Sequence, residues 1–342
     1  MAFDPLERRA VGRTGLAVTR LSFGGASIGG LFRPVEDDDA IRVARHAWDL
    51  GIRSFDTAPL YGYGASERRI GMALADRLRD DFVLSTKVGR RVYPTDAIPG
   101  GAEVDRQAIG PKEDAFYHRT EPVRMVFDYT YDGVLRSIEA SLARLGLERI
   151  DIAFIHDPDE HWEVAITGAY PALDRLRSEG VLGAIGAGMN QAPMLGRFAR
   201  ETDIDVILMA NRYTLLNQDA IHELLPLCSQ RGIAVMIGGV MNSGILVDPS
   251  RGGRFDYAPA PPEVVDRARR LAAVCDRHGV ALRAAAIQFP LAHPAVASLV
   301  AGVRSIEHLD EYPRAMAMEL PADLWTDLRA EGLLHPEAPV PA

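Results

Sequence analysis

VEDDDAIRVARHAWDLGIRSFDTAPLYGYGASERRIG, residues 35–71, holds one full structural repeat of the chain. An acidic first turn, apolar positions at helical spacing and the terminating Gly51 predict a helix over residues 35–51. The apolar run IRSFD at 52–56 predicts a buried strand, and the next helix is predicted to start with Ser66 as its N-cap. The order helix, strand, helix is typical of an α/β protein with a parallel sheet.

The same alternation continues along the 342 residues. Buried strands are predicted at 20–26, 52–56, 81–89, 150–156, 181–188, 204–211, 233–239 and 297–303, and further helices at 131–146, 169–179, 191–200, 218–231, 262–278, 281–292, 306–318 and 321–333. Eight strands, each followed by helical sequence, favour a closed (β/α)8 TIM barrel over an open doubly wound sheet. We expect an N-terminal β-hairpin at 8–19 and a single domain over 1–342, with a flexible tail at 335–342.

Two segments interrupt the alternation. Residues 89–129 follow the third strand and residues 240–261 follow the seventh. Both are predicted to be long loops, and loops of this length in a compact domain are usually functional. Because each follows a strand, both are expected on the face of the barrel where active sites lie.

Composition excludes several classes of protein. The chain is 47% hydrophobic and 25% charged, and no apolar run approaches the roughly 18 residues that a membrane-spanning helix needs. The start lacks a readable secretory signal, so we expect a cytoplasmic protein. A net charge of −9 spread along the chain argues against nucleic acid as a partner. Cys228 and Cys275 are interpreted as buried apolar residues rather than a disulfide.

Four ionisable residues lie at the ends of neighbouring predicted strands. Asp56 ends the second strand, Tyr61 follows it, Lys87 lies near the end of the third and His156 ends the fourth. We expect the Lys87 ammonium to lower the pKa of the Tyr61 phenol, and Asp56 to keep that ammonium charged and oriented. A neutral His156 can donate a hydrogen bond to a substrate oxygen. This set suits proton transfer to or from an oxygen, coupled to hydride transfer from a cofactor.

Three motifs at these strand ends, FDTAPLYGYGASERRIG, LSTKVG and FIHDPD, resemble those of the aldo-keto reductases, and the resemblance extends over nearly the whole chain. It implies a barrel that binds a nicotinamide dinucleotide without a Rossmann fingerprint and uses Asp56, Tyr61, Lys87 and His156 as its catalytic residues. Metal is not implied.

The resemblance also implies a set of cofactor contacts at the ends of strands five to eight. The candidates are Asn190, Asn211, Gly239, Met241, Gly244, Arg304, Ser305, His308, Glu311 and Tyr312. Gly238 stands where the family often has an aromatic residue that stacks on the nicotinamide. His308 replaces the usual arginine or glutamine near the adenosine phosphate, which favours NAD, with NADP as the alternative.

Within the family, the chain resembles sugar 1-dehydrogenases acting on L-fucose, D-threo-aldoses or L-galactose, and also pyridoxal 4-dehydrogenases. The first kind oxidises a cyclic hemiacetal to a lactone, with Tyr61 as the base; a general aldehyde or ketone reductase is a further alternative. Substrate contacts are expected from the long loops. The candidates are Asp114, Tyr117, His118, Arg119, Tyr129, Trp162 and Arg254. We expect a small sugar or aldehyde as substrate and a monomer or small homo-oligomer.

Two other functions remain open. HDPDEH at 156–161 holds two histidines and three acids, which would suit a metal-dependent barrel hydrolase. Some barrels of this family bind the cofactor chiefly as sensors. Each of the four strand-end residues also has a structural interpretation: a turn cap for Asp56, a loop aromatic for Tyr61, a solvated charge for Lys87 and a core histidine for His156.

Overall fold

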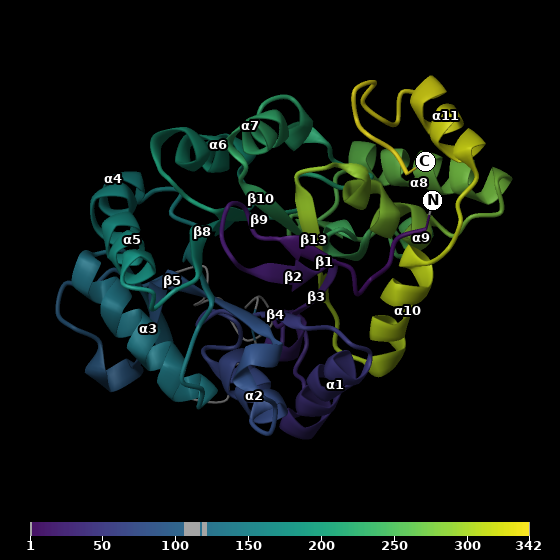
Figure 1. Ribbon diagram of the computed structural model, residues 1–342. Coiled ribbons are helices and arrows are strands. Elements are labelled where there is room, and N and C mark those ends of the chain that lie inside the picture. Colours follow the sequence, from purple (N-terminus) through teal and green to yellow (C-terminus); the bar gives the residue numbers. More distant parts are fainter. Residues whose placement is uncertain (1, 106–116, 118–121, 342) are drawn as a thin grey trace.

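The computed structural model describes residues 2–105, residue 117 and residues 122–341 (Figure 1). Within these residues, eight parallel strands form a ring in the order β4, β3, β13, β10, β9, β8, β7 and β5, and pairing of β4 with β5 closes it. Helices surround this ring (Figure 1). The predicted (β/α)8 barrel is therefore confirmed.

The bounds of the elements follow the predicted alternation closely. The barrel strands are β3 (Leu21–Gly24), β4 (Ser54–Asp56), β5 (Val83–Pro94), β7 (Ile152–His156), β8 (Ala184–Met189), β9 (Val206–Ala210), β10 (Ala234–Gly238) and β13 (Val296–Gly302). The remaining strands are β1 (Arg8–Ala10), β2 (Ala17–Thr19), β6 (Val123–Asp128), β11 (Arg254–Phe255) and β12 (Ala258–Pro259). The helices are α1 (Asp37–Asp49), α2 (Ala65–Leu74), α3 (Tyr131–Leu145), α4 (Trp162–Val164), α5 (Tyr170–Ser178), α6 (Ala192–Glu201), α7 (Leu224–Arg231), α8 (Pro262–Arg277), α9 (Leu282–Gln288), α10 (Ile306–Met316) and α11 (Ala322–Ala330).

The apolar core has two layers. The larger lies between the strands and the surrounding helices, and the smaller fills the barrel. Val11 and Val18, from the hairpin of β1 and β2, pack into the smaller layer against Ile152 and Val206, which begin their strands. The hairpin therefore covers the amino end of the barrel and leaves the carboxyl end for the site.

Three expectations about local structure were wrong. Ser66 is not the N-cap of α2: Gly64 takes that position with φ +90, a conformation that favours glycine. Ser66 Oγ instead contacts Thr57 Oγ1 at 2.8 Å and donates to the Gly25 carbonyl at 2.9 Å. The segment 89–129 is not simply a loop, because β5 continues to Pro94 and pairs antiparallel with β6. The helix expected at 218–231 begins only at Leu224, after a 3₁₀ turn.

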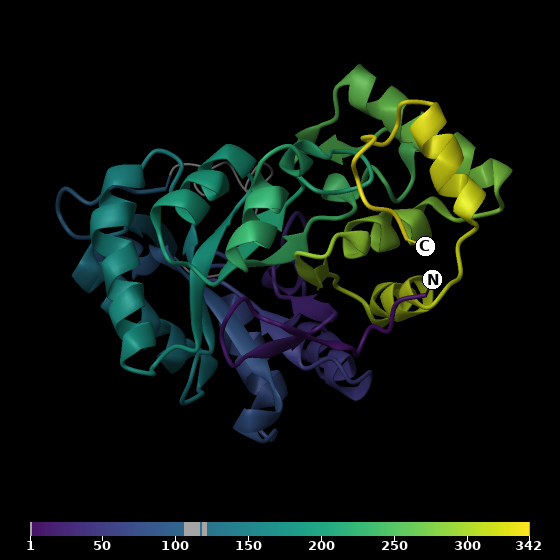
Figure 2. The same cartoon turned by 45° about the horizontal axis from the view of Figure 1, so that its top comes forward.

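The two ends of the described chain meet on one side of the barrel (Figures 1 and 2). Phe3 N donates to the Met316 carbonyl at 2.8 Å, and Val340 packs against the main core. Arg329 donates to the Ala338 carbonyl at 2.6 Å, and Ala338 is buried. The flexibility expected for 335–342 stays a prediction, although Ala338 and Val340 make packing contacts.

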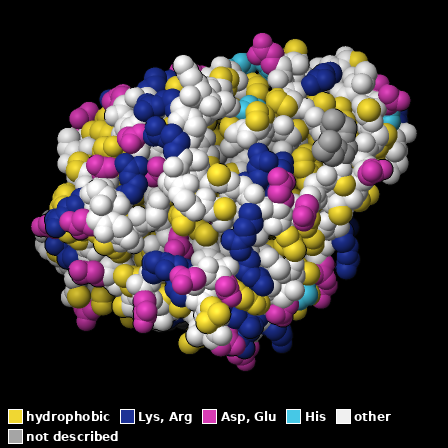
Figure 3. All heavy atoms as spheres, viewed as in Figure 1, with side chains coloured by type: hydrophobic (Ala, Val, Ile, Leu, Met, Phe, Trp, Pro, Cys, Tyr) yellow, Lys and Arg dark blue, Asp and Glu magenta, His cyan; other side chains and the backbone are white. Residues whose placement is uncertain are grey.

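Positive and negative side chains are interspersed on the face in Figure 3, in keeping with the charge pattern of the sequence. Among the described residues, no helix combines the length and apolarity needed to cross a membrane. Cys228 and Cys275 are both free and buried, which confirms their interpretation. Burial raises the pKa of each thiol to about 12, so both are protonated and unreactive near neutral pH.

Candidate active site

Asp56 ends β4, and Lys87 lies near the end of the part of β5 that pairs within the barrel. The two side chains form a buried ion pair. Lys87 Nζ lies 2.9 and 2.7 Å from the two carboxylate oxygens of Asp56, and it donates to the Thr57 carbonyl at 2.9 Å. Ser85 Oγ also donates to Asp56, at 2.7 Å. The Lys87 side chain is 1% exposed and that of Asp56 is 3% exposed, so direct hydrogen bonds rather than solvent fix the geometry of the pair. Burial lowers the pKa of Lys87, and the charge of Asp56 opposes this effect.

Tyr61 is placed over this pair by a tight turn. Its backbone N–H donates to Ala58 O at 3.1 Å, and Gly29 packs so closely that a Cβ there would lie 2.7 Å from the Tyr61 carbonyl carbon. Lys87 Nζ lies 4.6 Å from the centroid of the Tyr61 ring, within the range of a cation–π contact. The ammonium and the phenol are therefore neighbours, as the strand-end pattern predicts.

The pKa of Tyr61 does not follow the expected direction. Burial raises the pKa of the phenol well above its ordinary value, and the negative charge of Asp56 raises it further. The expected lowering by Lys87 is wrong for this structure, because Asp56 partly offsets the ammonium and a phenolate would lose its hydration. Tyr61 is consequently protonated near neutral pH and is a proton donor in this state.

His156 lies beside Tyr61 at the end of β7. The two rings are perpendicular, with centroids 5.9 Å apart. Burial, together with the positive charges of Arg90 and Lys87, lowers the pKa of His156 well below its usual value. The ring is therefore neutral, the state that the sequence interpretation requires. Its Nε2 lies 3.4 Å from Asp157 Oδ2, and its Nδ1 is buried without a hydrogen bond to any described residue.

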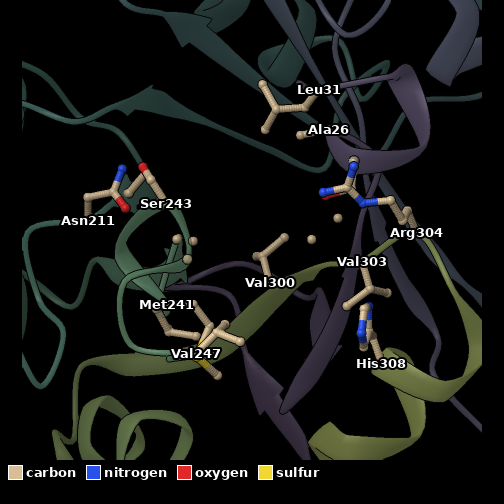
Figure 4. Close-up of a pocket in the computed structure, with 18 of the residues that line it drawn as sticks. Ala26, Leu31, Asn211, Met241, Ser243, Val247, Val300, Val303, Arg304 and His308 are labelled. Atoms are coloured by element: carbon tan, nitrogen blue, oxygen red, sulfur yellow. The ribbon is translucent and has the colours of Figure 1, made fainter. Parts of the chain in front are cut away.

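A cavity of about 470 Å³ adjoins Asp56 and Tyr61. It opens over the ends of the barrel strands, where Gly24, Ala210 and Gly238 contribute to its lining. In Figure 4 the guanidinium of Arg304 points into the cavity from one side, while Asn211 and Ser243 lie on the opposite side.

Polar groups left unpaired at both ends of this cavity fit a nicotinamide dinucleotide. At one end, Arg304 Nη1 is buried without a hydrogen-bond partner in the described part of the chain. Burial lowers the pKa of Arg304, and the positive charge of Arg33 lowers it further. An unpaired guanidinium there suits a phosphate. At the other end, Asn211 Oδ1 is also buried and unpaired, and it can accept from a carboxamide. A Cβ on Gly238 would find no atom nearer than 3.8 Å, which leaves space beside it for a ring.

Most of the cofactor candidates line this cavity. They are Asn211, Gly239, Met241, Gly244, Arg304, His308, Glu311 and Tyr312. Asn190 and Ser305 are not among the lining residues. Ser305 Oγ instead accepts the His308 N–H at 3.3 Å as the N-cap of α10.

Tyr257 is a residue that sequence reasoning missed. It belongs to the hairpin of β11 and β12, has φ +66 and lines the cavity. Its hydroxyl is hydrogen-bonded to the side chains of Asn190 and Asn211, and its ring lies 6.2 Å from that of Phe32. The Arg212 guanidinium anchors the hairpin through a bidentate pair with Asp256, at 2.7 and 2.8 Å. In the sequence, the length of the 240–261 segment was the one feature that indicated a contribution of this segment to the site.

The substrate candidates are dispersed. Tyr117 lies near the site, with its ring centroid 5.7 Å from that of Tyr61. The Tyr129 hydroxyl donates to the carbonyls of His156 and Asp157, at 2.6 and 2.9 Å, and so supports the backbone behind the site. Trp162 packs on Phe198 and is not among the cavity residues. Arg254 is exposed and lies over Phe32, which lines the cavity. The candidates Asp114, His118 and Arg119 lie outside the described residues.

The HDPDEH motif does not gather its side chains around one point. Asp157 pairs with Arg90 at 2.9 Å, and His161 Nε2 lies 3.1 Å from Glu103. Among the described residues, no group of three histidines, cysteines or acids is placed to hold a metal ion. Two of its residues are instead held apart by different partners, Asp157 by Arg90 and His161 by Glu103.

Comparisons with known proteins agree with this geometry. The sequence model described as Aldo/keto reductase family matches residues 20–331. A D-threo-aldose 1-dehydrogenase from Pseudomonas sp is 43% identical over 330 residues, covering 96% of this chain and 98% of the relative. A pyridoxal 4-dehydrogenase from Microbacterium luteolum is 43% identical over 341 residues, with the same coverage of 96% and 98%. The solved holo form of an aldo-keto reductase from Bacillus halodurans aligns with a TM-score of 0.72 at 24% identity, covering 96% of this chain and 97% of that one.

Proposed function

Because the chain belongs to the aldo/keto reductase family and is an NAD(P)-dependent oxidoreductase, we propose that it oxidises an aldose at C1, from the cyclic hemiacetal to the lactone. The observation that carries the proposal is the contact of one buried ammonium, that of Lys87, with both the Asp56 carboxylate and the face of Tyr61. This arrangement couples a phenol to a fixed charge beside a cavity of suitable size for a dinucleotide.

The roles of the residues follow from their positions. A nicotinamide dinucleotide held by Asn211 and Arg304 would provide the hydride acceptor for oxidation and the hydride donor for reduction. In reduction, the protonated Tyr61 hydroxyl donates its proton to the carbonyl oxygen. In oxidation, Tyr61 acts as the phenolate, after its proton has passed to solvent, and takes the proton from the C1 hydroxyl. Lys87 favours the transient phenolate, and Asp56 holds Lys87 in place. The neutral ring of His156 donates a hydrogen bond to the same substrate oxygen and orients it.

We propose NAD as the preferred cofactor. Arg304 supplies a guanidinium at the phosphate end of the cavity, but His308 stands where a second arginine would strengthen binding of a 2′-phosphate. Glu311, which lines the same end, is paired at 2.5 Å with Arg283, which also lines the cavity, so its carboxylate is held there with its charge partly offset. A 2′-phosphate would face this carboxylate, whereas a ribose hydroxyl can donate to it.

Pyridoxal 4-dehydrogenase activity is the second candidate. It is supported by the 43% identity to the Microbacterium luteolum enzyme, equal to that of the aldose dehydrogenase. Both reactions move hydride at a carbon that bears a hydroxyl in a cyclic hemiacetal or an alcohol, so the same four residues serve either one.

A substrate panel tests the proposal. Purified protein is assayed by nicotinamide absorbance with L-fucose, D-arabinose, L-galactose and pyridoxal, each with NAD and with NADP. We expect the largest kcat/KM for an aldose with NAD. Turnover of pyridoxal alone would replace the proposal with the second candidate, and cofactor binding without turnover of any compound would make the protein a cofactor-binding barrel.

A further inference from the structure

Asp157 is turned back toward the site by an unusual backbone conformation. It follows the last residue of β7 and has φ +41, in the left-handed region that few residues other than glycine, asparagine and aspartate adopt. Its N–H donates to Gly188 O at 3.1 Å, and its carbonyl accepts the Tyr129 hydroxyl at 2.9 Å. This conformation places its carboxylate against the ring of His156, with 3.4 Å between Oδ2 and Nε2.

Arg90 holds that carboxylate in place. The Arg90 side chain is 7% exposed, and its Nη1 lies 2.9 Å from Asp157 Oδ2 and 3.2 Å from the His156 carbonyl. Its Nε donates to Asp105 at 2.9 Å. Arg90 therefore faces two carboxylates with one positive charge, and Asp157 keeps part of its negative charge. Rigid support of this kind is typical of a side chain that must present an atom in one direction.

The other oxygen of Asp157 is available. Oδ1 makes no hydrogen bond to the residues that the structure describes, and the Asp157 side chain is 30% exposed. Burial raises the pKa of Tyr61, Tyr117 and Tyr257, and the negative charge of Asp157 adds to this effect at all three phenols. The contact that joins Asp157 to the site is the one with His156, which itself lies beside Tyr61. An unpaired acceptor therefore lies close to Tyr61 and His156, the two residues assigned to the reacting oxygen.

We propose that Asp157, oriented by Arg90, accepts a hydrogen bond from the substrate hydroxyl on the carbon next to the reacting carbon. The inference rests on the proposed function and defines its substrate class: compounds with a hydroxyl at that position are selected over those without one. A site that presents a fixed acceptor to a hydroxyl discriminates strongly against an analogue that lacks the hydroxyl, because the acceptor then loses its partner.

The test compares Asp157→Asn with the native enzyme on matched substrates. Asparagine tolerates the left-handed conformation and keeps the shape of the side chain, so the backbone at 157 is preserved. Glu160→Gln is the control, because it removes one negative charge from the same loop at an exposed position. L-Fucose and 2-deoxy-L-fucose form the substrate pair, since they differ only in the hydroxyl next to C1.

We expect Asp157→Asn to lose about 10- to 100-fold in kcat/KM for L-fucose and less than about threefold for the 2-deoxy sugar. Glu160→Gln should change neither. An equal loss on both sugars would overturn the proposal and leave Asp157 as a positioning residue for His156. No loss on either would also overturn it.

The pair glycolaldehyde and acetaldehyde, assayed as reductions, repeats the comparison without a sugar. If the native enzyme oxidises no aldose, the proposed function fails, yet this second pair still tests Asp157. The same selective loss on glycolaldehyde would support the role of Asp157 in hydroxyl recognition. Equal effects on both aldehydes would refute it independently.

Discussion

Removing one member of the Asp56–Lys87 pair should cost far more stability than removing both. In Lys87→Met, the Asp56 carboxylate stays buried with Ser85 as its remaining side-chain partner. Breaking a buried ion pair from one side costs roughly 3–5 kcal/mol, a large part of the ~5–15 kcal/mol that stabilises a typical domain. Asp56→Asn should carry a similar cost, because it leaves the ammonium uncompensated. The double variant removes both charges, and we expect its free energy of unfolding to return to within about 2 kcal/mol of the native value.

Urea unfolding followed by tryptophan fluorescence gives these free energies, and kcat is measured on the same samples. Arg175→Met is the control, because Arg175 and Glu179 form an exposed pair whose loss should change stability little. The double variant should be stable and still nearly inactive, since Tyr61 has lost its ammonium. A single variant as stable as the native protein would refute the reasoning, as would a double variant that loses the sum of both single costs.

Three further outcomes follow from the site and its surroundings. Tyr61→Phe should lower kcat by about 10²- to 10⁴-fold with little change in the cofactor dissociation constant, measured by fluorescence titration; an unchanged kcat would remove Tyr61 from the mechanism. Burial lowers the pKa of His293 from 6.5 to about 4, so its contribution to stability is complete above pH 6.5 and is lost as the pH falls toward 4; the loss should reach roughly 3 kcal/mol. Urea unfolding at a series of pH values should show that the free energy of unfolding falls less between pH 6.5 and pH 4 in His293→Gln than in the native protein. An identical fall in both proteins would contradict the assignment of this pH dependence to His293. His308→Arg should improve kcat/KM for NADP relative to NAD by about tenfold, because it adds a cation beside Arg304; steady-state assays with both cofactors check this, and an unaltered ratio would place the 2′-phosphate elsewhere.

The barrel was predictable because its signal is periodic. Strands such as IRSFD and helices such as 131–146 repeat in one order, and eight parallel strands that are each covered by a helix leave few architectures. The grouping of Asp56, Lys87 and His156 was predictable for the same reason, since parallel strands all end on one face. Ser66 shows the limit at the level of single residues: a serine at the right spacing predicts a cap, but the left-handed Gly64 takes the position and frees the hydroxyl for a tertiary contact.

The contribution of Tyr257 could not be predicted from the same pattern. It depends on a two-residue turn with positive φ at Asp256 and Tyr257, and on an ion pair between Asp256 and Arg212, which are 44 residues apart. No periodicity marks such a contact. The direction of the Tyr61 pKa was missed for a related reason. The sequence shows that a lysine is near, but the burial that outweighs it is a property of the folded chain.

Asp56 has two opposing effects on Tyr61, and this explains why a pair is needed rather than a lone lysine. Its charge raises the pKa of the Tyr61 phenol directly, yet its two contacts with Lys87 Nζ oppose the effect of burial on the pKa of Lys87. Without Asp56, the buried amine would be easier to deprotonate and would no longer favour a phenolate. With Asp56, the ammonium persists and contacts the phenol, while the resting phenol stays protonated. The site therefore stores a proton donor in the free enzyme and keeps beside it the charge that stabilises the phenolate once the proton has been transferred.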